Sequence, residues 1–220
     1  MAESVKQEIR NVVFDFGGVL INWKPADVVA GMFDGAELRE TIMRAVFRHP
    51  DWLEIDRGTF DDQAAITRFA ERTGLSEASM AELMLRTRDS LTLVPEMARL
   101  VRGLTVRGIS VYGLSNMSEE NFCFLVNRYD IWSAFTGIVI SGRVGTVKPE
   151  PRIYEHLMTE HGIEANETVF VDDLEANVVA AAELGFHTIH FRDHEDCERA
   201  LMAMAGLPRA SAPVRNHHRF

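Results

Sequence analysis

The sequence predicts an α/β fold, a parallel sheet with helices on both faces and a helical segment inserted after its first strand. Three observations lead to this prediction. Five short apolar runs alternate with helix-like patterns, most of the runs end in polar or glycine-rich corners, and a long stretch after the first run contains no convincing strand. Runs this apolar are typical of strands that are buried on both faces, as in parallel sheets.

The strands are expected at residues 12–14, 109–114, 138–140, 168–171 and 187–191. The helices expected between them cover residues 95–107, 118–129, 151–161 and 174–184. Pro95 stands at the start of the first helix, and Gly108 and Gly185 directly follow the first and the last. Proline in the first turn and glycine after the last turn are common helix boundaries.

Residues 21–93 interrupt this rhythm, with helical patterns at 36–47, 60–73 and 76–91, the last with Ser76 as its expected N-cap. We expect them to form a helical cap over the strand ends, the alternative being a helical bundle packed elsewhere. Residues 1–20 and 94–207 would then form the core. Residues 208–220 carry three arginines and no acid, which suggests a basic tail that is flexible or docks onto a partner.

Composition excludes several classes of protein. The chain has 220 residues, enough for one or two globular domains, and a net charge of −10. An acidic chain without a basic stripe is a poor match for nucleic acid or anionic membranes, so we expect neither as a partner. With two cysteines and no signal peptide or membrane span in the sequence, the expected location is cytoplasmic. Cys123, between two phenylalanines, is expected in the core.

Four polar corners follow predicted strands: Asp15, Ser115-Asn116, Lys148-Pro149 and Asp172-Asp173. Each corner alone has an ordinary explanation as a turn, a surface loop or a helix cap. Ligands of open α/β sheets bind at the carboxyl ends of the strands, so the four together predict a site at one sheet edge. An anionic substrate there would need a metal ion or a lysine, because the chain as a whole is acidic.

The corners and their flanking residues resemble the haloacid dehalogenase-like (HAD) hydrolase superfamily, in the branch with a helical cap after the first strand. The similarity covers nearly the whole chain and rests on four motifs, Val12–Leu20, Gly113–Asn116, Lys148–Tyr154 and Val169–Asn177. It implies a Rossmann-like core with an inserted cap, and hydrolysis of a small phosphomonoester, such as a sugar phosphate, as the activity.

The resemblance also implies roles. Asp15 would be the nucleophile that forms a phospho-aspartate, and Ser115, Asn116 and Lys148 would bind the phosphate. The expected cofactor is Mg²⁺, which suits carboxylate, carbonyl and phosphate oxygens. Its expected ligands are Asp15, the carbonyl of Gly17, and one or both carboxylates of Asp172 and Asp173, and the sequence does not say which of these two binds directly.

One position departs from the family pattern. Most phosphatases of the family carry a second Asp two residues after the nucleophile as general acid and base, and here that position is Gly17. Such assistance is commonly worth roughly 10²–10⁴ in rate. The substrate could have a good leaving group, a cap residue could supply the proton, or catalysis could be lost. With glycine at this position, the chain resembles a subgroup of the family that includes a bacterial α-glucose-1-phosphate phosphatase.

Cap residues are therefore candidates for the substrate site. Arg57 could clamp a phosphate or a sugar hydroxyl, or could simply be a solvated loop residue beside Asp56. Asp56, Asp27 and the junction at Trp23 are candidates for replacing the missing acid or contacting substrate. Two alternatives to a phosphatase remain at this point, a 2-haloacid dehalogenase, which needs no Mg²⁺, and a catalytically weak binding or regulatory protein. The sequence says nothing of the oligomeric state.

Overall fold

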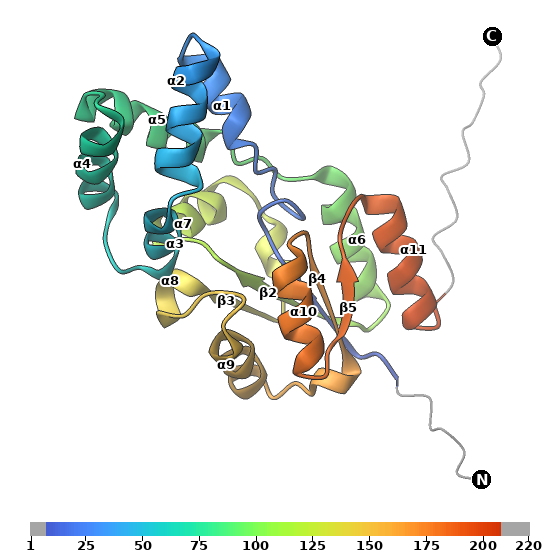
Figure 1. The fold of residues 1–220 in the computed structure, drawn as a ribbon. Helices are drawn as coiled ribbons and strands as arrows, with labels where there is room; N and C mark the ends of the chain where they lie inside the picture. The colour runs from blue at the N-terminus through green and yellow to red at the C-terminus, as the bar shows by residue number, and fades with distance from the viewer. Residues whose placement is uncertain (1–7, 208–220) are drawn as a thin grey trace, which may run out of the picture.

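The computed structural model describes residues 8–207 and contains a five-stranded, all-parallel sheet in the order β3-β2-β1-β4-β5 (Figure 1). The α/β fold predicted from the sequence is confirmed. The strands are β1 (Asn11–Phe14), β2 (Ser110–Ser115), β3 (Gly137–Ile140), β4 (Thr168–Asp172) and β5 (His187–His190). Phe14 pairs with Gly113 on one side and Val171 on the other, so the corners after the three central strands lie at one edge. The basic tail lies outside the described residues.

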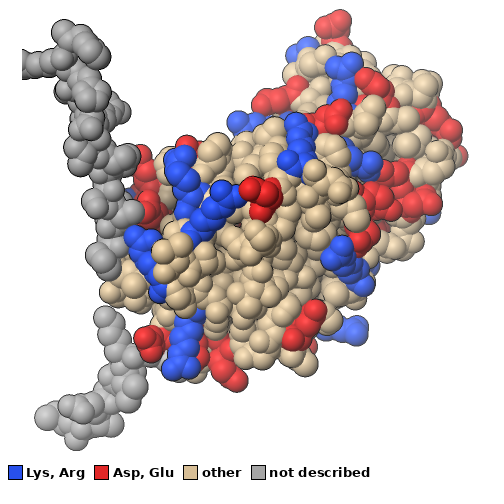
Figure 2. Space-filling model, turned by 180° about the vertical axis from the view of Figure 1, so that it is seen from behind, with Lys and Arg blue, Asp and Glu red and all other residues tan. Residues whose placement is uncertain are grey.

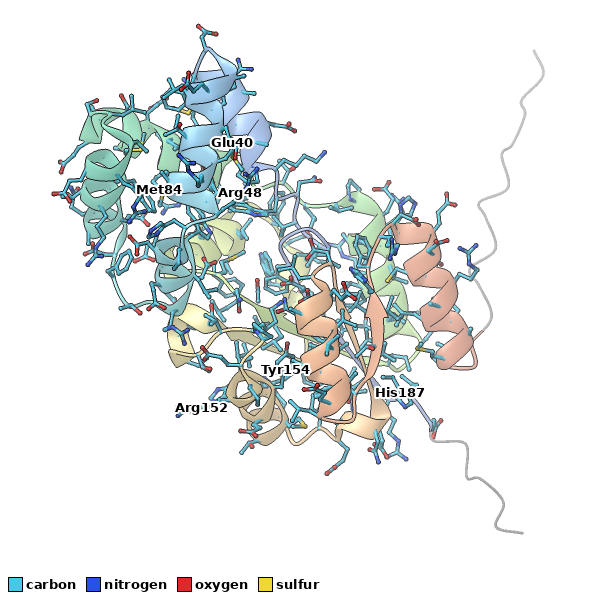
Figure 3. The ribbon with its side chains drawn as sticks, viewed as in Figure 1. Glu40, Arg48, Met84, Arg152, Tyr154 and His187 are labelled. Carbon is cyan, nitrogen blue, oxygen red and sulfur yellow. The ribbon has the colours of Figure 1, made fainter. Side chains whose placement is uncertain are left out.

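Helices cover both faces of the sheet because alternate strand residues point to opposite sides. Val12 and Phe14 pack with α6 (Pro95–Val106), α7 (Glu119–Arg128) and α11 (His194–Met204). Val13 packs with α9 (Pro151–His161) and α10 (Glu175–Glu183) on the other face. Tyr154, labelled in Figure 3, is fully buried there, and its hydroxyl donates to the main-chain carbonyl of Asn177 (3.0 Å).

The segment between β1 and α6 is helical throughout, as expected, and builds its own hydrophobic core. Its helices are α1 (Pro25–Met32), α2 (Ala36–Ile42), a π-helical turn η1 (Met43–Phe47), α3 (Pro50–Arg57), α4 (Asp62–Thr73) and α5 (Glu77–Asp89). The Ser76 hydroxyl accepts the amide of Ser79 (3.2 Å), which confirms it as the N-cap of α5. The sequence analysis did not predict α1, α3, the short α8 (Ser141–Val144) or α11.

The two chain segments that join the helical insertion to the core run side by side. Ile21 forms an antiparallel bridge with Leu93, and the amide of Val94 donates to the carbonyl of Leu20 (2.8 Å). Figure 1 shows the insertion standing over one end of the sheet, with α3 beside α8. This arrangement agrees with the expected cap over the strand ends.

Three consecutive cap residues at the end of α3 contact the core. The Ser141 hydroxyl donates to the carbonyl of Asp56 (2.5 Å). The guanidinium of Arg57 makes two hydrogen bonds to the Glu150 carboxylate, 2.7 and 3.0 Å long. Gly58 adopts φ +80°, and a Cβ there would come within 2.7 Å of the Gly142 carbonyl oxygen. We call these contacts the α3 seam.

The described surface carries charges of both signs. Figure 2 shows basic and acidic side chains interspersed over one face. Ion pairs such as Arg102 with Asp130 (2.7 Å) contribute to this mixture. Among residues 8–207, no helix is long and apolar enough to cross a membrane.

The expectation that Cys123 lies in the core is wrong. Its helix α7 buries Phe122 and Leu125 against the sheet, whereas Cys123 is exposed and its thiol contacts the Glu119 carboxylate (3.4 Å). The apolar flanking residues misled the prediction, because adjacent helix positions point in different directions.

The α3 seam predicts a difference between two glycines that both end cap helices with positive φ. In Gly74→Ala (φ +69°, with no atom within 4 Å of the added Cβ) we expect a loss of about 1 kcal/mol, from backbone strain alone. Gly58→Ala adds the clash with Gly142 and should lose a further ~1–3 kcal/mol. Chemical denaturation of both variants measures this, and equal losses would show that the close contact at Gly58 has no energetic effect.

Candidate active site

Lys148 lies at the centre of the site, between two carboxylates that come from different strands. Its Nζ is 2.8 Å from Oδ1 of Asp15, which follows β1, and 2.7 Å from Oδ2 of Asp172, which ends β4. All three side chains are buried. Burial opposes the charge of Lys148, but the two carboxylates outweigh it and hold its pKa above the usual value.

Asp15 has a perturbed pKa because of the same surroundings. Burial raises the pKa of this carboxyl group to about 7, and the charge of Asp172 adds to the effect, while Lys148 opposes it. The main-chain amide of Phe16 also donates to Oδ1 of Asp15 (2.6 Å) and helps to orient it. A cation bound beside Asp15 would favour the ionised form that a nucleophile requires.

Asn116 fixes the main chain of Lys148. Its side-chain amide donates to the carbonyl of Lys148 (2.9 Å), and its side-chain oxygen accepts the amide of Lys148 (2.7 Å). The Lys148–Pro149 peptide bond is cis. Asn116 was expected to bind substrate, and it does line the cavity, but both ends of its amide are engaged in positioning Lys148.

The two neighbouring aspartates differ in their surroundings. Asp172 is buried and accepts hydrogen bonds from Lys148, from the Asn177 amide (2.9 and 3.1 Å) and from the main-chain amide of Leu174 (2.9 Å). Asp173 is half-buried, and within residues 8–207 no side chain hydrogen-bonds to its carboxylate. Burial, reinforced by the charge of Asp172, raises the pKa of Asp173.

These carboxylates fit a divalent cation. Oxygen atoms of Asp15, Asp172 and Asp173 lie within 4.8 Å of one another, and hard cations such as Mg²⁺ bind one or two carboxylates together with phosphate oxygens and waters. Because the oxygens of Asp172 already have partners, Asp15 and Asp173 are the carboxylates available for direct coordination. Gly17, whose carbonyl was expected as a ligand, lines the same cavity.

Ser115 presents a buried hydroxyl at the end of β2. Its side chain is 1% exposed, and Oγ has no hydrogen-bond partner within the described part of the chain. A buried hydroxyl without a partner is uncommon and costs free energy unless a ligand satisfies it. The unpartnered hydroxyl is compatible with the expected role, but Ser115 does not line the cavity, so its contact with a phosphate oxygen stays a prediction.

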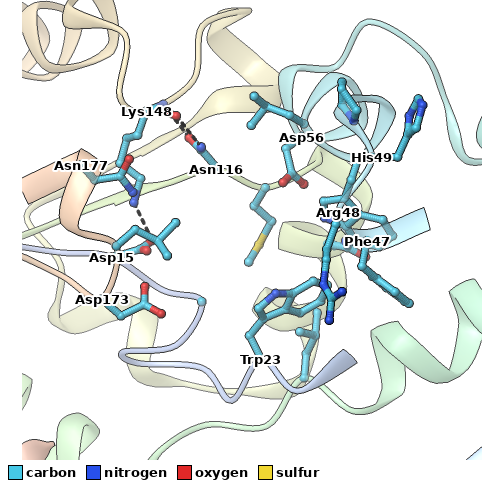
Figure 4. Close-up of a pocket in the computed structure, with 18 residues that line it drawn as sticks. Asp15, Trp23, Phe47, Arg48, His49, Asp56, Asn116, Lys148, Asp173 and Asn177 are labelled. Atoms are coloured by element: carbon cyan, nitrogen blue, oxygen red, sulfur yellow. Dashed lines mark hydrogen bonds and ion pairs between the residues drawn. The ribbon is translucent and has the colours of Figure 1, made fainter. Parts of the chain in front are cut away.

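A cavity of about 510 Å³ lies between the core and the cap. Asp15, Gly17, Asn116, Lys148 and Asp173 are among the residues that line it, whereas Ser115 and Asp172 are not. Asp15, Lys148 and Asp173 lie at its core side, and Asp56 faces them from the cap side (Figure 4). Burial raises the pKa of Asp56 well above its usual value, and the charge of Asp15 adds to this while Lys148 opposes it. These surroundings favour the protonated form of Asp56.

The structure places Arg57 differently from the prediction. Arg57 does not line the cavity, because its guanidinium is held by Glu54 and Glu150 in the α3 seam. The Arg57 hydrogen bonds, together with one from Thr146, lower the pKa of Glu150 to about 2. Arg57 therefore contacts the core at the α3 seam and does not face the substrate cavity. Asp27 is exposed and outside the cavity lining, whereas Trp23 forms part of its wall.

Several residues of the site were not predicted from the sequence. Arg48 and His49, between η1 and α3, line the cavity, and Arg48 donates to Glu40 (2.7 Å) in the cap (Figure 3). Asn177 orients Asp172, and it was quoted in the fourth motif without a role. Pro50 is a typical first residue of a helix and could have indicated a helix directly after Arg48 and His49, but this helix start was not recognised.

Adjacent glycines provide a test of the cation site. A Cβ on Gly18 (φ +76°) would lie 2.3 Å from Oδ2 of Asp173, whereas a Cβ on Gly17 would meet only Trp23 Cβ, at 3.9 Å. Gly18→Ala should therefore displace Asp173 and weaken Mg²⁺ binding at least about tenfold, as for other residues that orient ligands. Gly17→Ala, the control, should bind Mg²⁺ nearly as the parent does. Calorimetric titration compares them, and equal affinities would exclude Asp173 as a ligand.

Comparisons with known proteins agree with this geometry. A sesquiterpene phosphatase of Aspergillus oryzae is 29% identical over 182 residues, covering 82% of this chain and 89% of its own. A D-ribitol-5-phosphate phosphatase of Bacteroides thetaiotaomicron is 31% identical over 205 residues, covering 88% and 97%.

Solved structures share the fold. A HAD-family enzyme from Bacteroides thetaiotaomicron, solved with magnesium and inorganic phosphate, has a TM-score of 0.67 at 23% identity and covers 84% of this chain and 94% of its own. An L-2-haloacid dehalogenase has the same fold, so the fold does not separate the two activities. The model of the haloacid dehalogenase-like hydrolase family matches residues 9–185. The chain belongs to the haloacid dehalogenase-like hydrolases.

Proposed function

We propose that this enzyme is a Mg²⁺-dependent phosphatase that hydrolyses a small phosphomonoester through a phospho-Asp15 intermediate. The observation that carries the proposal is the Lys148 ion pair with Asp15, 2.8 Å long, beside the available carboxylate of Asp173. A nucleophile, a fixed positive charge and a cation site thus meet at one strand edge. Phosphoryl transfer requires these three elements.

Asp15, Lys148 and Ser115 have different roles in the proposed reaction. The Asp15 carboxylate attacks phosphorus as the ester P–O bond breaks, while Lys148 and the Ser115 hydroxyl hold phosphoryl oxygens. Water then attacks the phosphorus of phospho-Asp15, which releases inorganic phosphate and restores the carboxylate. When bound, Mg²⁺ would neutralise charge on the phosphoryl oxygens, with Asp15, Asp173 and the Gly17 carbonyl as its protein ligands.

Asp56 supplies the proton that Gly17 cannot. It faces the nucleophile from the cap, and its raised pKa favours the acid form that can protonate the leaving oxygen. As a carboxylate it then accepts a proton from the attacking water, which returns it to the acid form. The α3 seam holds it in place through its own carbonyl. With an acid present, the substrate need not be a sugar 1-phosphate whose leaving group departs unaided.

The alternatives fit the site less well. A 2-haloacid carries its own carboxylate and needs no metal, so the unpaired negative charge of Asp173 beside the nucleophile would repel it. A protein that only binds phosphate has no need of a buried carboxyl group paired with a lysine at the phosphate site. The phosphatase uses every charged group at the sheet edge.

The first test is phosphate release from a panel of phosphomonoesters with and without Mg²⁺. We expect release that depends on Mg²⁺ and is abolished in Asp15→Asn, because the amide cannot act as the nucleophile. Circular dichroism should show the variant folded. Release that persists in Asp15→Asn would contradict the proposal, and so would turnover of 2-haloacids in place of phosphate esters.

The role of Asp56 predicts a dependence on the leaving group. Asp56→Asn should lower kcat/KM for butyl phosphate by roughly 10²–10⁴ but that for p-nitrophenyl phosphate much less. The reason is that kcat/KM reports formation of phospho-Asp15, and nitrophenolate leaves in that step without a proton. The raised pKa keeps the acid form to a higher pH than in an ordinary aspartate. The parent's rate on butyl phosphate should therefore fall as pH rises through that pKa, and this alkaline limb should be missing in Asp56→Asn.

A rescue variant controls for structural damage. Gly17 has room for a side chain, with Trp23 Cβ 3.9 Å from the added Cβ as its nearest contact. Adding Gly17→Asp to Asp56→Asn should restore part of the butyl phosphate activity. An equal loss on both substrates without rescue would show that Asp56 only supports the cap.

A further inference from the structure

The cavity continues beyond the phosphate site into an apolar chamber. Its walls are formed by Trp23 at the cap junction, Phe47 at the end of η1, Trp52 and Leu53 on α3, and, from the core side, Leu91, Met117 and Leu174. We infer that this chamber binds the leaving group, and that the substrate is the monophosphate ester of a long apolar alcohol, such as an isoprenoid or fatty-alkyl chain. The inference rests on the proposed function and names its substrate class.

Three aromatic rings form the cap side of the chamber. Ring centroids are 4.7 Å apart for Phe47 and Trp52, 5.4 Å for Trp23 and Trp52, and 6.0 Å for Trp23 and Phe47. All three side chains are half-buried, although they line the contact between cap and core. Aromatic side chains that served only to pack the two parts together would be buried. The exposed surface of the three rings lines a cavity, where an apolar ligand can bury it.

Two leucines extend the apolar surface to solvent. Leu53 is 37% exposed on the cap wall, and Leu174 is 57% exposed on the core wall. Both line the same cavity. Exposed apolar side chains are costly in water, and an apolar chain bound in the cavity would cover both leucines.

Few polar side chains line the outer part of the cavity, and each holds one hydrogen bond within the protein. Arg48 donates to Glu40 (2.7 Å), and the His49 ring nitrogen accepts the amide of Asp51 (3.1 Å). The Asn121 side-chain oxygen accepts from Arg88 (2.9 Å). A sugar has several hydroxyl groups, and the few polar side chains in this mostly apolar part of the cavity offer fewer hydrogen bonds than the hydroxyl groups would lose from water. An alkyl or isoprenoid chain loses no hydrogen bonds.

The size of the chamber fits such a chain. The whole cavity, with the phosphate site and the chamber together, has a volume of about 510 Å³, within the usual range for small-molecule sites. At roughly 30 Å³ for a water-sized group, it holds on the order of fifteen non-hydrogen atoms, those of the phosphate included. One relative is named as a phosphatase of sesquiterpenes, which are apolar, and another as a phosphatase of D-ribitol 5-phosphate, which is polar. The apolar walls of the chamber favour an apolar substrate in this chain.

The test compares kcat/KM for butyl, octyl and dodecyl phosphate with that for ribitol 5-phosphate, glucose 1-phosphate and p-nitrophenyl phosphate. We expect kcat/KM to rise with chain length, by up to about fourfold per buried methylene, until the chamber is filled. Both sugar phosphates should be poorer than dodecyl phosphate. Flat chain-length dependence, or preference for a sugar phosphate, would overturn the inference and leave the phosphatase proposal standing.

Variants at the opening supply a matched control. Leu53→Asn combined with Leu174→Asn should lower the ratio of dodecyl to p-nitrophenyl phosphate kcat/KM at least about tenfold. Leu85→Asn removes a leucine that is 51% exposed on α5, outside the cavity lining, and should leave both values unchanged. An unchanged ratio in the double variant would contradict the inference.

Binding separates failure of the inference from failure of the proposed function. If no ester, p-nitrophenyl phosphate included, is hydrolysed, the proposed phosphatase is wrong. Calorimetry with Asp15→Asn still decides the chamber's role, because it needs no turnover. Dodecyl phosphate that binds much more tightly than butyl phosphate supports an apolar-chain site, and equal affinities overturn it.

Discussion

The buried ammonium group of Lys148 holds the site together. Asp15 and Asp172 come from neighbouring strands, and without a cation between them their charges would repel in a region shielded from water. Removing one partner of such a buried group commonly costs about 3–5 kcal/mol. The parallel pairing of β1 with β4 sets the spacing of the two carboxylates, and Asn116 fixes the lysine main chain.

Core and cap contribute different ends of the cavity. The core supplies the charged groups at the strand edge, which do not depend on the identity of the alcohol. The cap supplies Asp56 and most of the apolar wall, and the α3 seam fixes both relative to the core. In the proposed mechanism, one short helix couples proton donation to recognition of the leaving group. A change in α3 can therefore alter the substrate while the phosphate site stays intact.

Much of the site could be predicted from the sequence, because it lies where buried strands end. Asp15, Ser115 and Lys148 follow apolar runs, and parallel strands bring such positions to one edge. The choice between Asp172 and Asp173 could not be predicted. It depends on hydrogen bonds from Asn177 and Lys148 that only the folded chain brings together.

The cap was predicted less completely for a related reason. Helix α3 has eight residues, too few for a clear periodic pattern, and it was missed although it carries Asp56 and Trp52. Arg57 was a candidate for the substrate site, and its contact with Glu150, 93 positions away in the sequence, could not be foreseen. Contacts of this kind are set by how the insertion docks on the core. Local residue patterns contain no information about that docking.

The central claim is that the phosphoryl group passes through Asp15, and trapping the intermediate tests it most directly. The enzyme is mixed with p-nitrophenyl phosphate and Mg²⁺, quenched in acid during turnover and analysed by peptide mass spectrometry. We predict a phosphoryl group on Asp15 that disappears when the substrate is exhausted. Steady phosphate release from a chain that is never phosphorylated, or phosphorylation at another residue, would contradict the mechanism.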